Sequence, residues 1–335
     1  MRNRKIQYSM LLLSACWLLS ASTLPWKSEP VELEFPKSWP KPVYDFSKNP
    51  LTKQGVELGR RLFYDPILSR DSTVSCSNCH LSFTAFTHVD HALSHGIENR
   101  IGTRNSPALT NLAWAKSFMW DGAVNHLDFQ ALAPIAHPAE MDNSIENVVQ
   151  KIQVNPKYKT RFFEAFGDSI VTGERLLKAM AQFELTLISA NSKYDRMIVG
   201  KEKFTEQEQS GYQVFQKNCA SCHVEPLFTN HNFERNGLPL DTTLNDFGRM
   251  KITKLPADSL KFKVPTLRNI EFSYPYMHDG RFKKLREVIN HYAQTTALAR
   301  KIELSPNEKV DLVAFLLTLT DKEFLFNPNH SFPRD

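Results

Sequence analysis

Apolar residues recur at helical spacing in four separate stretches of the chain. The stretches are Leu51, Leu58 and Leu62; Ile145, Val148, Val149 and Ile152; Leu176, Met180, Phe183 and Leu187; and Val310, Val313, Ala314 and Leu317. Residues at i, i+3, i+4 and i+7 share one face of a helix, which packs in the core. A further helix is expected from about residue 285 to residue 292. Because the alternation typical of strands is weak throughout, the pattern predicts an all-α fold with long loops.

Capping residues indicate where three of these helices begin. A polar N-cap side chain and a glutamate three residues later bond reciprocally to the first free backbone N–H groups of a helix. The pairs are Asn143 with Glu146, Thr205 with Glu208, and Ser305 with Glu308. We therefore expect helices to begin directly after Asn143, Thr205 and Ser305.

Proline and glycine divide the chain into segments. Six prolines fall between residues 23 and 50 and disfavour helix there, so we expect an extended arm. Gly200 and its neighbours separate two helical regions and mark the expected domain boundary. The predicted organisation is an arm at 23–50, an N-terminal domain at 51–198 and a C-terminal domain at 199–335.

The first 22 residues have the pattern of an export signal. Arg2, Arg4 and Lys5 precede an apolar run from Met10 to Leu19, and small residues follow that run. The run is shorter than the stretch of about 20 residues that spans a membrane as a helix. We therefore expect residues 1–22 to be removed and the mature protein to be periplasmic.

A second interpretation of this segment involves Cys16. Leu13-Ser14-Ala15-Cys16 resembles a bacterial lipobox, in which the chain is cut before the cysteine and the cysteine is acylated. The apolar run continues past that point through Leu19, as it does in an ordinary export signal. A lipid-anchored form and a free form are therefore both open.

The charge of the chain argues against a nucleic-acid partner. The formal net charge is +5, and three of the positive charges belong to the signal segment. Lys and Arg are scattered, without the basic run that is typical of nucleic-acid binding. We interpret them as ordinary solvated surface residues.

Two copies of one short motif carry the chemistry. The copies are Cys76-Ser77-Asn78-Cys79-His80 and Cys219-Ala220-Ser221-Cys222-His223. This C-x-x-C-H pattern is the attachment site of a c-type haem, whose vinyl groups bond the two thiols while the histidine becomes the proximal iron ligand. With 5 Cys and 11 His in 335 residues, one accidental copy is expected about 0.002 times. The sequence therefore predicts two covalently bound haems.

Other uses of paired cysteines fit the sequence less well. A zinc ribbon needs roughly 15–20 residues between its two pairs, whereas Cys79 and Cys219 are 140 positions apart. A thioredoxin-like pair needs no following histidine and lies in a βαβ unit, for which the sequence has no pattern. We therefore prefer haem attachment at both motifs.

The residues that follow each motif resemble the bacterial di-haem cytochrome c peroxidase family, which includes the MauG-type enzymes. The resemblance extends from about Leu58 to Leu319. The stretches that carry it are Arg104-Asn105-Ser106-Pro107, Phe118-Met119-Trp120-Asp121-Gly122, Pro138-Ala139-Glu140-Met141 and Tyr274-Pro275-Tyr276-Met277-His278-Asp279-Gly280. The resemblance implies two cytochrome-c-like domains, of which the N-terminal one holds the peroxidatic haem and the C-terminal one the electron-transfer haem.

The resemblance also assigns roles around the first haem. Glu140 matches the catalytic glutamate, Gln130 the active-site glutamine, and Trp120 the tryptophan between the two haems. A carboxylate can remove a proton from one peroxide oxygen and return it to the leaving oxygen, and a glutamine can orient peroxide without titrating. His95 matches the distal histidine that blocks the peroxidatic iron in the resting state of many peroxidases.

The residues themselves leave the roles of these positions open. His88 and His91 are weaker candidates for the distal ligand than His95, and MauG-type members can lack such a ligand. Without the resemblance, Glu140 is one acidic residue of a loop and His95 a solvated loop histidine. Trp120 is in either case an aromatic residue at the expected domain interface.

A calcium ion and a second distal ligand are implied in the same way. Asn105 matches the side-chain ligand of an interdomain calcium, and Ser273 and Pro275 match its backbone-carbonyl ligands, oxygen donors that suit Ca²⁺. Where the peroxidases carry a methionine on the second haem, this chain has Tyr292, as MauG-type enzymes do. The alternative is that Met277 is the ligand and Tyr292 packs in the core.

We therefore expect a di-haem peroxidase that reduces hydrogen peroxide with electrons from a small cytochrome or cupredoxin. The alternatives are a MauG-type enzyme that uses peroxide to oxidise a partner protein and a di-haem electron carrier. The presence of Glu140 and Gln130 argues against the carrier, whereas Tyr292 favours the MauG-type reaction. The sequence leaves open whether the chain forms a homodimer.

Overall fold

The computed structural model describes residues 26–298 and 300–334. The helices of its first half are α1 (Lys53–Tyr64), η1 (Pro66–Leu68), η2 (Cys76–Asn78), η3 (Ser82–Thr84), η4 (Ile97–Asn99), η5 (Leu112–Trp114), η6 (Leu127–Phe129), α2 (Leu132–Ala136), α3 (Ile145–Gln153), α4 (Pro156–Phe166) and α5 (Gly173–Leu185), where η denotes a 3₁₀ helix. The expected export signal and Cys16 lie outside the described residues.

The second half contains the remaining helices and one pair of strands. These elements are α6 (Lys193–Ile198), α7 (Glu206–Asn218), β1 (Phe233–Arg235), α8 (Met250–Thr253), η7 (Pro256–Asp258), β2 (Lys261–Lys263), α9 (Leu285–Gln294), α10 (Pro306–Leu317) and α11 (Lys322–Leu325). The strands are antiparallel, and Glu234 lies opposite Phe262. The protein is thus mainly helical with long loops, as expected, but the short strand pair means that it is not strictly all-α.

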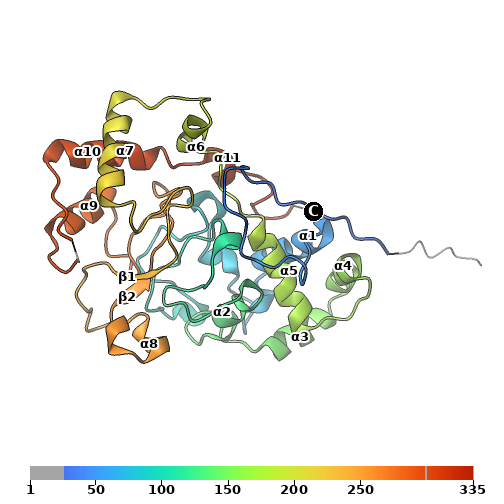
Figure 1. Cartoon of the computed structure of the whole chain (residues 1–335). Helices are drawn as coiled ribbons and strands as arrows, with labels where there is room; N and C mark the ends of the chain where they lie inside the picture. The colour runs from blue at the N-terminus through green and yellow to red at the C-terminus, as the bar shows by residue number, and fades with distance from the viewer. Residues whose placement is uncertain (1–25, 299, 335) are drawn as a thin grey trace, which may run out of the picture.

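Each half is built on one pair of helices that cross at a glycine. In the first half α1 packs against α5, and in the second half α7 packs against α10. A Cβ at Gly59 would lie 1.8 Å from the carbonyl oxygen of Ala179, and a Cβ at Gly211 would lie 1.9 Å from that of Asp311. Only glycine allows backbones to approach this closely. Figure 1 shows the two pairs at opposite sides of the molecule, with the strands near the second pair.

Three of the four predicted apolar faces lie in the core, and one is wrong. The buried residues are Leu58 and Leu62 of α1, Val148 and Ile152 of α3, and Leu176, Met180 and Phe183 of α5. On α10, however, the buried side chains are Leu312, Phe315 and Leu316, while Val310 and Leu317 of the predicted face are exposed. Because α10 is apolar on nearly every side, the sequence pattern did not indicate which face packs against α7.

One predicted helix start is displaced by a residue. Thr205 and Ser305 cap α7 and α10 as expected, each paired with the predicted glutamate. The N-cap of α3 is Ser144, whose hydroxyl accepts a hydrogen bond from the N–H of Asn147, and not Asn143. The side chain of Asn143 is instead buried and donates to the carbonyl oxygen of Leu68, so it ties α3 to the loop before the first haem motif.

The described part of the predicted arm, residues 26–50, is extended and packs on the first half of the protein. Trp39 makes an edge contact with Trp114, with ring centroids 5.2 Å apart. The indole N–H of Trp114 donates to the carbonyl oxygen of Pro40. The C-terminal tail returns to the same half, where the carbonyl oxygen of His330 accepts a hydrogen bond from Tyr64.

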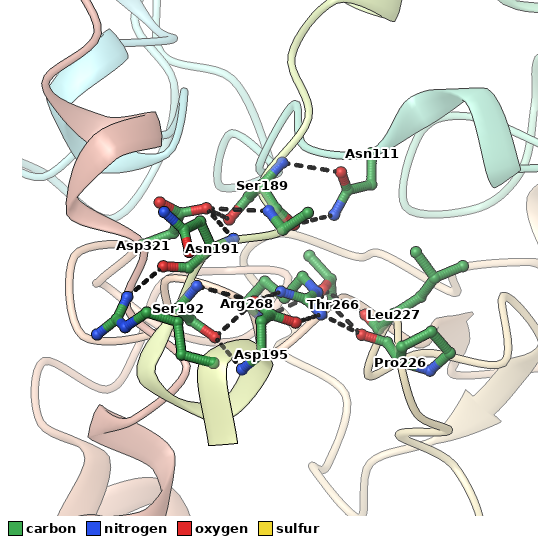
Figure 2. Close-up of polar contacts among 12 residues, drawn as sticks. Asn111, Ser189, Asn191, Ser192, Asp195, Pro226, Leu227, Thr266, Arg268 and Asp321 are labelled. Carbon is green, nitrogen blue, oxygen red and sulfur yellow. Dashed lines mark hydrogen bonds and ion pairs between the residues drawn. The ribbon is translucent and has the colours of Figure 1, made fainter. Parts of the chain in front are cut away.

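A buried ion pair fixes the junction between the two halves. Arg268 is fully buried, and its guanidinium donates two hydrogen bonds, of 2.7 and 2.8 Å, to the carboxylate of Asp195. It also donates to the carbonyl oxygen of Pro226 and stacks over the ring of Trp39. One side chain therefore joins α6, the loop after the second haem motif and the N-terminal arm, as Figure 2 shows for the first two.

The segment between α5 and α6 is held by a second buried carboxylate. Asp321 Oδ2 accepts hydrogen bonds from the N–H groups of Ala190 and Asn191 and from the hydroxyl of Ser189. The backbone of Ser189 also pairs with the side chain of Asn111, and these contacts surround the segment in Figure 2. The connection between the halves is thus rigidly bonded.

No helix within the described residues is long and apolar enough to cross a membrane.

We expect the substitution Arg268→Met to lower the free energy of unfolding by about 3–5 kcal/mol, because it leaves a buried carboxylate without its partner. The pKa of Asp195 would be raised by its burial, but the hydrogen bonds and charge of Arg268 outweigh this and leave it lowered. The contribution is therefore present above the unfolded-state pKa, about 3.9, and disappears as pH falls below it.

Chemical denaturation of the haem-loaded protein measures this effect. Arg175→Met is the matched control, because Arg175 pairs with Asp168 at the surface and should contribute about 0–1 kcal/mol. Equal losses in the two variants would show that the buried pair does not hold the junction.

Candidate haem and peroxide site

The first haem motif forms a tight turn that brings its cysteines and histidine together. The N–H of His80 donates to the carbonyl oxygen of Cys76 at 3.0 Å, and the side chain of Asn78 closes the turn by accepting from the N–H of Ser75. The ring Nδ1 of His80 lies 2.7 Å from the carbonyl oxygen of Phe86. Because a carbonyl oxygen only accepts, Nδ1 carries the proton, and Nε2 keeps its lone pair.

The second motif repeats this arrangement at the end of α7. The N–H of His223 donates to the carbonyl oxygen of Cys219 at 2.9 Å, and its ring Nδ1 donates to the carbonyl oxygen of Phe228 at 3.1 Å. Desolvation by the surrounding protein lowers the pKa of His80 and of His223 to about 4. Both rings are therefore neutral at pH 7, each with one nitrogen oriented and ready to bind a metal.

The cysteines of both motifs are free thiols, as haem attachment requires. Burial raises the pKa of Cys76, and it raises that of Cys219 to about 12. Within the described residues, no group of three or more histidine, cysteine or carboxylate side chains is arranged to hold a metal ion.

A large cavity adjoins the second motif. Its volume is about 370 Å³, and it is lined by Cys219, Cys222 and His223 together with apolar side chains of α9 and α10. Tyr292 and Met277 both line it. Burial raises the pKa of Tyr292, and the nearby thiols of Cys219 and Cys222 raise it further. An apolar cavity with two thiols and one oriented imidazole on its wall fits a c-type haem.

Glu140 lies next to the first motif. Its carbonyl oxygen accepts from the N–H of Ile97 at 2.8 Å, and a Cβ at Gly96 would lie 2.3 Å from the same oxygen. The carbonyl oxygen of His95 lies 3.5 Å from Sγ of Cys79. The structure therefore brings His95, Glu140 and the first motif together, as expected from the sequence.

The carboxyl of Glu140 is suited to hold a proton. Its side chain is 29% exposed, and it lies 3.8 Å from Nδ1 of His137, which is more exposed. Burial raises the pKa of Glu140, and the opposing effect of His137 is smaller. A carboxyl with a raised pKa and a partner at the surface can act as both base and acid.

Three histidines of the loop after the first motif are in ring-to-ring contact, with their planes inclined to one another by 74° and 59°. The ring centroids of His88 and His91 are 3.8 Å apart, and those of His91 and His95 are 3.9 Å apart. Burial is the main cause of the lowered pKa of His88 and of His91. Nδ1 of His88 is buried without a hydrogen-bond partner, so this cluster has an unused lone pair or proton.

Trp120 lies at the contact between the two halves of the protein. It lines the cavity of the second haem and also a smaller cavity of about 50 Å³ between the halves. Its indole N–H donates to the carbonyl oxygen of Asn105, and its own carbonyl oxygen accepts from the N–H of Lys263 in β2. Gln130 lies beside the same segment, where its side-chain amide contacts Sδ of Met119 at 3.8 Å.

The three residues expected to bind calcium line one cavity. Asn105, Ser273 and Pro275 all contribute to the wall of the second-haem cavity. Asn105 comes from the first half and the other two residues from the second half. The side-chain N–H of Asn105 donates to the carbonyl oxygen of Ala92, which leaves its side-chain oxygen available.

The carbonyl acceptors of the two histidines were missed in the sequence, although a signal was present. Phe86 and Phe228 follow their motifs at nearly the same distance, and each precedes a threonine. This repeated Phe-Thr pair could have been recognised as part of the internal repeat. The sequence interpretation also missed Glu184, a buried carboxyl whose charge contributes to the raised pKa of Cys76. A signal was present, because a charged residue between two core residues, Phe183 and Leu185, is unusual.

The paired haem motifs, the repeated helix crossing and the oriented histidines define a di-haem c-type cytochrome. Comparison with protein families supports and refines this class. Residues 53–203 match the family described as di-haem cytochrome c peroxidase, and residues 208–320 match cytochrome c.

Individual relatives agree with the family match. The chain is 35% identical to the methylamine utilization protein MauG of Methylorubrum extorquens, over 85% of this chain and 82% of the relative. It is 36% identical to the cytochrome c551 peroxidase of Nitrosomonas europaea, over 79% of each chain. The solved structure of a MauG-like protein associated with microbial copper homeostasis matches with a TM-score of 0.82 and 30% identity, covering 90% of this chain and 99% of that one.

The chain belongs to the di-haem cytochrome c peroxidase family. It is therefore an oxidoreductase with two c-type haems, as the sequence predicted.

Proposed function

We propose that the protein reduces hydrogen peroxide to water at the first haem, with two electrons from a small donor protein such as a cytochrome c or a cupredoxin. The observation that carries this proposal is the position of Glu140, whose carboxyl lies beside the first haem motif with a raised pKa. A pure electron carrier has no use for an acid–base group at this place.

The protein side chains have separate tasks in this reaction. The haem held by Cys76, Cys79 and His80 supplies the iron at which the peroxide O–O bond is cleaved. Glu140 removes the proton from one peroxide oxygen and returns it to the oxygen that leaves as water. Gln130 orients the peroxide through its amide. His137 connects Glu140 to solvent, since the two side chains are in contact near the surface.

The second half would supply electrons to the first. A second haem would be held by Cys219, Cys222 and His223, and Trp120 lies on the wall of the cavity beside them and of the space between the halves. We propose that the indole of Trp120 carries the electron or hole between the haems. In this scheme the domain at 51–198 is peroxidatic and the domain at 199–335 transfers electrons.

The resting state and the location of the protein belong to the same proposal. We propose that His95 would be a ligand of the iron of a haem at the first motif in the resting state, with the rings of His91 and His88 next to it in line. The N-terminal export pattern supports a periplasmic location, in which a donor cytochrome or cupredoxin is accessible. The sequence around Cys16 supports a lipid anchor as the alternative to a free protein.

A MauG-type reaction is the second candidate function. In this reaction the oxidising equivalents of peroxide are used on a partner protein rather than on an electron donor. Its support is Tyr292, which lines the second-haem cavity close to Cys219 and Cys222, together with the similarity to proteins named MauG. The two functions share Glu140 and differ in the second haem.

We further propose that Ca²⁺ binds between the halves. Its ligands would be the side-chain oxygen of Asn105 and the backbone carbonyl oxygens of Ser273 and Pro275, which line one cavity. These are neutral oxygen donors that leave room for water ligands, as calcium accepts. The ion would hold the segment of Trp120 in place, because the indole N–H is bonded to Asn105.

We expect Glu140→Gln to lower the rate of peroxide turnover by about 10²–10⁴-fold while both haems stay attached. The amide keeps the size of the side chain but cannot take up and return a proton. Stopped-flow oxidation of a reduced small cytochrome c by peroxide measures the turnover, and mass spectrometry counts the haems.

The exposed Glu146 of α3 provides the matched control, since Glu146→Gln should leave the turnover unchanged. Near-normal turnover in Glu140→Gln would remove this residue from the mechanism.

The same assay on the wild-type protein separates the candidate functions. Rapid donor oxidation supports the peroxidase, whereas a long-lived oxidised state that does not react with the donor supports the MauG-type reaction. The absence of any reaction with peroxide would support an electron carrier.

We expect Tyr292 to be the distal ligand of the second haem iron. A phenolate is a hard anionic donor, so it should lower the reduction potential relative to a methionine thioether, which raises it. Redox titration of Tyr292→Phe should therefore show a higher potential for one haem, whereas Met277→Leu should titrate like the wild-type protein.

Near-infrared spectra distinguish the two candidate ligands. A methionine-to-iron charge-transfer band that is present in the wild-type protein, lost in Met277→Leu and retained in Tyr292→Phe would contradict the assignment. Met277 would then be the ligand, and the second haem would resemble that of the peroxidases.

We expect removal of calcium to slow electron transfer between the haems and to lower turnover, because the contact between the halves at Asn105 loosens. Exhaustive chelation followed by the same stopped-flow assay measures both, and added Ca²⁺ should restore them. If chelation that removes all bound calcium changes neither rate, calcium has no role in this protein.

A further inference from the structure

Glu184 is a fully buried residue whose carboxyl oxygen Oε2 has no hydrogen-bond partner among the described residues. It is the penultimate residue of α5, and only 2% of its surface is exposed. Buried carboxyls are normally paired or hydrogen-bonded, so an unpaired one indicates a neighbour that the polypeptide does not supply.

The charged groups on the elements that pack against α5 are engaged elsewhere. On α1, Arg60 donates to backbone carbonyl oxygens of the C-terminal tail, and Tyr64 does the same. Arg61 pairs with Glu57 of its own helix. On η6, Asp128 accepts a hydrogen bond from Tyr44. Among the described residues, none of these groups neutralises Glu184.

Cys76 packs against the hydrophobic cluster that contains Phe183 and Leu185, the two neighbours of Glu184. The charge of Glu184 also contributes to the raised pKa of Cys76, after the larger effect of burial. When haem is attached, this thiol becomes an uncharged thioether at the edge of the porphyrin. The charge that then faces Glu184 is that of the haem itself. Burial raises the pKa of Glu184 to about 8, and its position in the last turn of a helix also disfavours a negative charge.

We propose that Glu184 is the redox-linked acid of the first haem. Its carboxyl holds a proton when the haem iron is ferrous and releases it when the iron is ferric, so that one electron and one proton are taken up or lost together. Oxidation adds one positive charge to the haem, and the carboxylate formed by proton release neutralises that charge. The proposal rests on haem attachment at Cys76 and does not depend on the reaction with peroxide.

The reduction potential of the first haem should consequently depend on pH. Loss of a proton on oxidation makes the ferric state more stable as pH rises, so the potential falls. The Glu184 carboxyl has one pKa when the iron is ferric and a higher pKa when the iron is ferrous. The potential falls most steeply at pH values between these two. In that window, each tenfold change in proton activity shifts a one-electron couple by up to about 59 mV.

Potentiometric titration of the holoprotein at several pH values, followed by visible spectra, tests this. In the wild-type protein, one haem should show the pH-dependent potential between pH 6 and pH 8, and Glu184→Gln should remove it. Glu174→Gln is the matched control, because Glu174 is an exposed residue of the same helix, paired with Lys178. This variant should titrate like the wild-type protein.

Glu140 is the other carboxyl next to the first motif. The variant Glu140→Gln distinguishes its contribution to the pH dependence from that of Glu184. The pH dependence should persist in Glu140→Gln. A dependence that is lost in Glu140→Gln and kept in Glu184→Gln would overturn the proposal, and so would a wild-type potential that does not change with pH. Loss of turnover in these variants would concern the peroxidase function only and would not bear on the potential.

If Glu184→Gln does not take up haem, a second measurement on protein that keeps Glu184 tests the proposal. Redox-difference infrared spectra of fully loaded Glu140→Gln should show the C=O stretch of a protonated carboxyl disappearing when the first haem is oxidised. If no such band changes with the oxidation state, Glu184 does not exchange a proton with the redox reaction.

Discussion

The hydrogen bond from each haem-binding histidine to a phenylalanine carbonyl oxygen is the constraint on which both halves depend. It selects the tautomer, directs Nε2 toward the place of the iron and sets the plane of the ring. In each half the acceptor comes from the loop directly after the motif, Phe86 for His80 and Phe228 for His223. The helix crossings at Gly59 and Gly211 then supply the apolar walls. Each half is thus a separate solution to the same problem of holding one flat, covalently bound group.

Two such halves become one enzyme only if their haems keep a fixed relation. The buried pair of Arg268 and Asp195 is well suited to this, because breaking it exposes two charges to an apolar interior. It lies at the segment that joins the halves, where Asp321 also bonds three successive backbone or side-chain groups. Trp120 lies at the contact between the halves, where its carbonyl oxygen accepts a hydrogen bond from the N–H of Lys263. The bonded junction holds the two halves, and with them the two haem motifs, in one fixed relation.

The parts of this protein that the sequence predicts are those that depend on local chemistry. The two haem motifs are five consecutive residues each, so their meaning does not depend on the fold. Arg268 and Asp195, in contrast, are distant in the sequence, and only the folded chain brings them together. The buried face of α10 was missed because Val310 and Leu317 are as apolar as Leu312 and Phe315. The proposed calcium ligands and distal haem ligands were assigned only through family resemblance. Ligand atoms that lie in loops leave no periodic pattern in the sequence.

Glu140 and Glu184 illustrate how one physical effect yields two different groups at the same haem. Desolvation raises the pKa of both carboxyls. Glu140, however, lies on a loop, keeps part of its surface exposed and contacts His137, so protons can pass between it and solvent. Glu184 lies between buried phenylalanine and leucine side chains on a helix, and its Oε2 has no hydrogen-bond partner among the described residues. These surroundings are the reason why we propose proton transfer with the substrate for the first carboxyl and redox-linked charge compensation for the second. A substitution that opened the core around Glu184 to water would remove this difference, because a hydrated carboxylate no longer needs the haem to stabilise its charge.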